Sequence, residues 1–168
     1  MSLLPRKPIR RRTDGRYDIN IDDGEREVLA VFLEQLRDLL LHDDPLLRRL
    51  FPVAYVNDAE RDADYQRLMH GELIEARFAS IETMEETLHR RVVDEAELTR
   101  WMQSINSLRL VIGTRLDVSE DPDDDVDEDD PDHDFFQIYH YLGYLIGYIV
   151  EALTPALPEP TDLELFDE

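Results

Sequence analysis

The histidines and carboxylates are the side chains of this sequence best suited to chemistry. Glu86 and His89 form a Glu-x-x-His pair, a spacing that places both side chains on one helix face, where they can bind a metal ion. A two-metal carboxylate bundle needs a second such pair, and Arg67 stands at the matching place before His70. A metal-dependent bundle enzyme is therefore the least favoured interpretation, and we predict no metal site.

Motifs for nucleophilic catalysis and for phosphate binding are also missing. No serine stands in a Gly-x-Ser-x-Gly elbow, and no glycine-rich loop is present to hold a phosphate. The chain has no cysteine, which excludes disulfides and thiolate metal sites within it. We therefore predict a protein that is not an enzyme, with no catalytic residues and no cofactor.

A basic N-terminal arm is the candidate contact site. Residues 1–16 carry six basic side chains against one acid, Asp14, so this arm has a local charge of +5 in a chain of net charge −22. We predict contact with DNA or with a protein partner through Arg6, Lys7, Arg10, Arg11, Arg12 and Arg16. The alternative is that these side chains are solvated or pair with nearby carboxylates.

The rest of the charge is strongly acidic and lies mostly at the other end of the chain. From Leu116 onward there are 18 acidic residues and no lysine or arginine. Such a molecule repels nucleic acid overall, because nucleic-acid binding depends on neutralising phosphates. Any DNA contact must therefore be local to the basic arm, which could instead fold back on the acidic third.

A β-hairpin over residues 7–21 is expected to position the basic arm. Tyr17, Ile19 and Ile21 alternate with polar residues, as in a strand with one buried face. Asp14-Gly15 favours a type I′ turn, in which both central residues have positive φ. An isolated hairpin is marginally stable in water, so this one must pack against helices.

Residues 22–118 are predicted to form a helical core. Asp22 and Glu25 have the spacing of a capping box at the start of a first helix that runs to about His42. Its expected apolar face comprises Val28, Phe32, Leu36, Leu39 and Leu40. A short helix over 46–51 follows Pro45, which suits a first helical position.

Two longer helical patterns complete the core. The stretch 58–91 has apolar residues at helical spacing, including Tyr65, Leu68 and Ile81, and Gly71 divides it or bends it. The stretch 94–118 begins with Asp94 and Glu97, which have the same capping-box spacing. It holds the only tryptophan, Trp101, on a wide apolar stripe. We expect this tryptophan to mark the centre of the core.

The last third of the chain divides into three parts. Residues 119–134 contain 11 acidic residues and two prolines, so we predict a disordered loop there. Residues 135–154 are apolar nearly all round, which favours a buried, central helix, and the flanking acids and internal polar residues argue against a membrane span. Residues 155–168 form a proline-rich acidic tail.

The order of these features resembles a known family. The segments EVLAVFLEQLRDLL, DPLLRRLFPVAY and WMQSINSLRLVIGTRLDVSED, with the Tyr/Leu-rich final helix, are similar to actinobacterial AosR-type oxidative-stress transcriptional regulators, formerly a domain-of-unknown-function family. The resemblance covers nearly the whole chain. It implies a regulator that acts with RNA polymerase through a sigma factor. Redox sensing in that family is attributed to a cysteine pair, which this chain lacks.

Together these features predict one mainly α domain over residues 1–168, a bundle of about five helices with an N-terminal β-hairpin and a disordered acidic loop. The expected function is a non-enzymatic transcriptional regulator of the oxidative-stress response. The alternative is a protein-interaction adaptor without nucleic-acid binding. Because the N-terminus lacks the apolar stretch of a signal peptide, we expect a cytoplasmic protein without membrane association. A homodimer through the last helix stays open.

Overall fold

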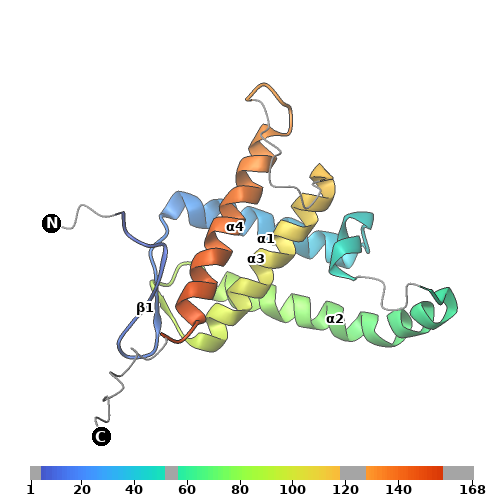
Figure 1. Ribbon diagram of the computed structural model, residues 1–168, viewed down its shortest axis with the longest axis horizontal. Helices are drawn as coiled ribbons and strands as arrows, with labels where there is room; N and C mark the ends of the chain where they lie inside the picture. Colours follow the sequence, from blue (N-terminus) through green and yellow to red (C-terminus); the bar gives the residue numbers. More distant parts are fainter. Residues whose placement is uncertain (1–4, 52–56, 118–127, 157–168) are drawn as a thin grey trace, which may run out of the picture.

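The fold is a helical bundle with a small sheet at its N-terminal side (Figure 1). The computed structural model describes residues 5–51, 57–117 and 128–156. Within them the elements are β1 (Ile9–Arg11), β2 (Tyr17–Ile19), α1 (Asp23–Leu41), the 3-10 helix η1 (Pro45–Leu50), α2 (Ala59–Thr87), β3 (Val92–Val93), α3 (Glu95–Leu116) and α4 (His133–Leu153). The predicted fold class is confirmed.

Helix α3 is the centre of the core, as its tryptophan predicted. Trp101 is fully buried, and its indole N–H donates a 2.7 Å hydrogen bond to Thr87 Oγ1 of α2. Helices α2 and α4 and the short η1 all pack against α3. Figure 1 shows α4 alongside α3, with β1 beside the C-terminal end of α4.

Both predicted capping boxes are present. Asp22 accepts from the Glu25 backbone N–H at 2.8 Å, and the Glu25 carboxylate accepts from the Asp22 N–H at 2.7 Å. Asp94 and Glu97 repeat this exchange at the start of α3. These reciprocal bonds satisfy backbone donors that have no partner within the helix, and so they fix where α1 and α3 begin.

The sheet has three antiparallel strands in the order β1-β2-β3. Ile9 pairs with Ile19 and Arg11 with Tyr17, while Tyr17 also pairs with Val93 of the unpredicted β3. The predicted type I′ turn is wrong, because only Gly15 has a positive φ, of 83°. The connection is instead a β-turn in which the Gly15 N–H donates to the Arg12 carbonyl at 3.3 Å.

The buried stripe of α1 includes Leu36 and Leu40, as predicted, but in the first half of the helix it lies one position away from the predicted residues. Leu29 and Leu33 are buried together with Leu36 and Leu40, whereas Val28 is exposed. This helix is leucine-rich on adjacent positions, so two stripes fit the same period and the spacing alone does not choose between them.

Helix α2 is continuous through Gly71 rather than divided there. Only its last third is buried, through Ser80, Ile81, Met84 and Thr87. Its other end extends beyond the rest of the bundle in Figure 1, and Leu68, predicted on the apolar stripe, is 79% exposed.

The prediction that the last helix is central and buried nearly all round is wrong. Only Leu142, Leu145, Ile149 and Ala152 of α4 are buried, while Tyr144 and Val150 are about half exposed. The helix covers α3 with one face and leaves its opposite face open.

Parts of three predicted segments fall outside the described residues. For the predicted helical core these are residues 52–56 and 118. For the predicted acidic loop these are residues 119–127; of the rest, 128–132 form turns and α4 begins at His133. For the tail they are residues 157–168. Among the described residues, no helix has the length and apolar character needed to span a membrane.

Candidate functional site

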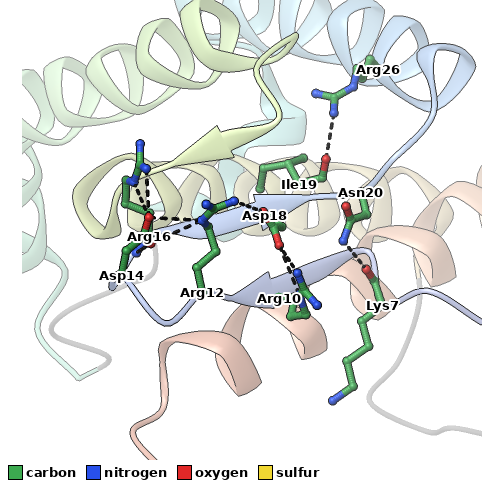
Figure 2. Close-up of polar contacts among 9 residues, drawn as sticks. All are labelled: Lys7, Arg10, Arg12, Asp14, Arg16, Asp18, Ile19, Asn20 and Arg26. Carbon is green, nitrogen blue, oxygen red and sulfur yellow. Dashed lines mark hydrogen bonds and ion pairs between the residues drawn. The ribbon is translucent and has the colours of Figure 1, made fainter. Parts of the chain in front are cut away.

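Asp18 of β2 forms ion pairs with two of the predicted contact residues. Arg10 Nη2 donates to Asp18 Oδ2 at 2.6 Å, and Arg12 Nη1 donates to Asp18 Oδ1 at 2.9 Å (Figure 2). Asp18 itself is buried. The hydrogen bond from Arg10 lowers the pKa of the Asp18 carboxyl, and the bond to Asp18 raises the pKa of Arg12.

Asp14, in the hairpin turn, accepts hydrogen bonds from Arg12 and Arg16. It accepts from the Arg16 backbone N–H at 3.0 Å and from Arg16 Nη2 at 2.9 Å, and Arg12 Nε approaches within 3.3 Å. These contacts are drawn in Figure 2. The bonds from Arg16, first from its backbone and then from its side chain, lower the pKa of Asp14 to about 2.

The remaining three predicted contact residues differ in the groups that they contact. Lys7 donates to Glu151 Oε1 of α4 at 2.5 Å, and this bond raises the Lys7 pKa. Arg11 lies 6.0 Å from the ring centroid of Tyr17. Arg6 has no carboxylate partner among the described residues.

Four of the six cations of the N-terminal arm are therefore paired, and they share three carboxylates. Lys7, Arg10, Arg12 and Arg16 follow the alternative stated for them, pairing with nearby carboxylates. Three of these four pair within the hairpin, and only Lys7 reaches the acidic third of the chain. A continuous row of free cations, which a phosphate backbone would require, is not formed by these four side chains.

A polar pocket lies where this arm meets α1 and the loop after α2. Its volume is about 590 Å³. The ionisable side chains in its lining are Arg6, Arg12, Asp18, Asp22, Asp23, Arg26, His89 and Arg91. Arg91 and His89 are exposed and, like Arg6, have no carboxylate partner in the described part of the chain. Since Asp18 and Asp22 are engaged in the arginine pairs and the α1 cap, the pocket presents more free cations than free acids.

Arg26 forms the floor of this arrangement. It is only 4% exposed, and its guanidinium donates to the backbone carbonyls of Leu88, of Arg90 at 3.0 Å, and of Ile19 at 3.1 Å. Figure 2 shows the bond to Ile19. Burial lowers its pKa, and no carboxylate accepts from its guanidinium among the described residues. This side chain joins β2, α1 and the α2–β3 loop.

Sequence reasoning missed three of the pocket residues, and only one left a signal. Arg26 lies three positions before Leu29, so it continues the buried stripe of α1, and this helical spacing predicts that Arg26 is buried. His89 and Arg91 follow α2, and they reach the pocket because β3 pairs with β2. A two-residue strand has no periodicity from which that pairing follows.

The predicted lack of a metal site concerned Glu86 and His89. Both residues are exposed, and His89 faces the polar pocket. Across residues 5–51, 57–117 and 128–156, no group of three or more histidine or carboxylate side chains is placed to hold a metal ion.

The fold and the site together define a small helical bundle whose N-terminal sheet presents an arginine-lined pocket. The chain belongs to the family described as "Domain of unknown function (DUF2017)", whose model matches residues 6–153. Searches of curated proteins and of solved structures gave no match.

Proposed function

We propose that this protein is a non-enzymatic regulatory protein that binds an acidic segment of a protein partner in the pocket lined by Arg6, Arg26 and Arg91. The observation that carries the proposal is that Arg6 and Arg91, two exposed cations of that pocket, have no carboxylate partner among the described residues, in a chain of net charge −22. A free guanidinium beside a polar hollow suits carboxylate recognition, because its planar donors match a carboxylate in pairs.

The finer proposal is transcriptional regulation of the oxidative-stress response through RNA polymerase and a sigma factor. Its support is the resemblance of the segments around DPLLRRLFPVAY and WMQSINSLRLV to AosR-type regulators. Since the chain contains no cysteine, the redox signal must reach it through the partner.

The test is a binding measurement between this protein and purified RNA polymerase carrying an alternative sigma factor. Arg91→Glu reverses a free charge in the pocket, and we expect it to weaken binding about tenfold. Arg48→Glu is the matched control, since Arg48 is an exposed arginine on η1, away from the pocket. Absence of wild-type binding overturns the partner assignment, and equal losses in both variants overturn the pocket assignment.

The second candidate is an adaptor that binds protein but no nucleic acid. Pairing of Arg10, Arg12 and Arg16 with Asp14 and Asp18 favours it over direct DNA contact, because paired guanidinium groups have fewer donors left for phosphate. Fluorescence anisotropy with labelled duplex DNA separates the two. Binding that weakens steeply with added salt and is lost in an Arg11→Glu variant supports direct DNA contact and contradicts the adaptor.

A further inference from the structure

The outward face of α4 is uncharged where a solvent-facing helix surface is normally polar. From Phe135 to Val150 the helix carries no aspartate, glutamate, lysine or arginine. Tyr144 is 49% exposed and Val150 is 47% exposed. A helix that packs on one side only is expected to place charged residues on the other, so this face is suited to being covered.

Three tyrosines form an ordered row on this side of α4. The rings of Tyr141 and Tyr144 stack with centroids 6.4 Å apart, and Tyr144 and Tyr148 meet edge to face at 4.9 Å. The Tyr141 hydroxyl donates to Glu25 Oε1 of α1 at 2.9 Å, and burial together with this bond raises the pKa of Tyr141. Because mutual contacts already hold these rings, a partner that covers them loses little side-chain entropy on binding.

Gly147 leaves a gap within this row. Tyr144, Gly147, Tyr148 and Glu151 are spaced three and four residues apart, so they share one helix face. A Cβ placed on Gly147 would meet no atom within 4 Å, whereas one on Gly143 would meet Arg109 Nε at 3.2 Å. Gly143 is therefore covered within the chain, and Gly147 is open to the backbone of another molecule.

Charge selects the kind of molecule that fits. Glu25 lies at one end of the tyrosine row and Glu151 at the other, where its carboxylate pairs with Lys7. A second copy would bring the same acidic surface and another net charge of −22, and a nucleic acid would be repelled in the same way. Both oxygens of Glu25 are engaged, by the Asp22 N–H and by the Tyr141 hydroxyl, whereas Glu151 is 58% exposed and bonds Lys7 through one oxygen. A cationic side chain therefore gains from Glu151, from the acidic protein as a whole and from the faces of the tyrosine rings.

We propose that the α4 face formed by Tyr144, Gly147 and Tyr148 is a docking surface for a basic amphipathic helix of a partner protein. The apolar side of that helix covers the tyrosine row, its backbone approaches at Gly147, and its lysines or arginines lie against the exposed Glu151 and the tyrosine ring faces. This surface does not involve the arginine-lined pocket and stands or falls separately from it.

The test uses the full chain and a fluorescent peptide of about 18 leucine and lysine residues arranged as an amphipathic helix. Its controls are a peptide of the same composition in a non-amphipathic order and an amphipathic peptide with glutamate in place of lysine. We expect binding of the basic amphipathic peptide, with both controls at least about tenfold weaker.

Variants of the protein then locate the binding. Gly147→Leu adds a side chain whose Cβ meets no atom within 4 Å, and Tyr144→Ala removes the central ring. Each is expected to weaken peptide binding about tenfold. Gly71→Leu is the matched control, because Gly71 on α2 is equally open. Circular dichroism verifies that all three variants keep the helical content of the wild type.

Four outcomes overturn the proposal. Equal binding of the two basic peptides, or an equal effect of Gly147→Leu and Gly71→Leu, would mean general attraction to an acidic protein. A wild-type dimer in sedimentation equilibrium that Gly147→Leu converts to monomer would assign the face to a second copy. Binding to uncharged phosphatidylcholine vesicles that Gly147→Leu abolishes would assign it to a lipid surface.

Discussion

The N-terminal hairpin and α4 pack against each other, yet they present opposite kinds of surface. The hairpin is dense in charge, and most of its cations are held by Asp14, Asp18 or Glu151. The outward face of α4 is nearly without charge, and Tyr144, in the middle of its tyrosine row, is about half exposed. A cluster of charges in the sequence therefore identified a surface that is largely occupied, while an apolar segment expected to be buried supplied a free one.

The two surfaces also differ in what holds them in place. Polar bonds to one buried guanidinium and to two aspartates organise the sheet and its loop. Apolar packing on α3 organises α4, through Leu142, Leu145 and Ile149. Substitutions at polar positions are therefore expected to act on the sheet region, and the outward face of α4 is expected to tolerate change.

The largest effect is expected from Arg26→Leu. This substitution leaves the buried carbonyls of Ile19 and Leu88, and the carbonyl of Arg90, without their guanidinium donor, at a cost of about 3 kcal/mol in the free energy of unfolding. Urea denaturation measures it. Glu27→Leu, at the next and exposed position, should change this free energy by less than about 0.5 kcal/mol. If Arg26→Leu also lowered the free energy of unfolding by less than about 0.5 kcal/mol, polar bonds would not be what holds the sheet region in place.

A smaller loss is expected from Asp18→Asn. The amide keeps the shape of the side chain but gives up the charged acceptor of Arg10 and Arg12, which lowers the free energy of unfolding by about 2 kcal/mol. The same change frees two guanidinium groups on the hairpin. We therefore expect tighter binding to duplex DNA at low salt, measured by anisotropy, and unchanged DNA affinity would contradict the neutralising role of Asp18.

On α4 the expected effect is small and has the opposite sign. Gly147→Ala should stabilise the protein by about 1 kcal/mol, because alanine favours a helix and its Cβ meets nothing. Gly143→Ala should gain less, since its Cβ presses on Arg109 Nε. Thermal unfolding compares the two variants. Equal melting temperatures for Gly143→Ala and Gly147→Ala would contradict the claim that Gly143 is covered within the chain while Gly147 is open.

The smallest change is a titration confined to the hairpin turn. Asp14 has a folded-state pKa of about 2, below its ordinary value of 3.8, so its bonds stabilise the turn above pH 3.8 and are lost as the pH falls toward about 2. Carboxyl NMR signals measure this pKa. Arg16→Ala should raise it toward the ordinary value, while the Tyr144 ring signals should not shift across this range. An unchanged Asp14 pKa in that variant would contradict the assigned cause.

Much of the fold followed from local sequence signals. The capping boxes at Asp22 and Asp94, the proline before η1 and the alternation of Tyr17, Ile19 and Ile21 are short-range features, and each predicted its element. The hairpin turn was missed because Asp-Gly also occurs where only the glycine has positive φ.

The surface was harder to predict, because it depends on contacts between distant segments. Asp18 faces Arg10 through strand register, and Lys7 reaches Glu151 only after α4 has packed beside β1. The same limit explains the wrong prediction for α4. A helix that is apolar all round is expected at the centre of a bundle, but its composition does not show how many other elements pack against it. Arg26 shows the reverse case, where a charged residue on an apolar stripe was overlooked.

The hydrogen bonds from the Arg26 guanidinium to the carbonyls of Ile19, Leu88 and Arg90 have a consequence for folding during biosynthesis. The strands β1 and β2 are synthesised first, but their third strand, β3, and two of the three carbonyls that Arg26 bonds lie in residues 88–93. Until that part of the chain has been made, the hairpin is an isolated two-stranded ribbon of marginal stability. The pairs that Arg10 and Arg12 form with Asp18 depend on the register of these two strands, so during synthesis they are only as stable as that ribbon.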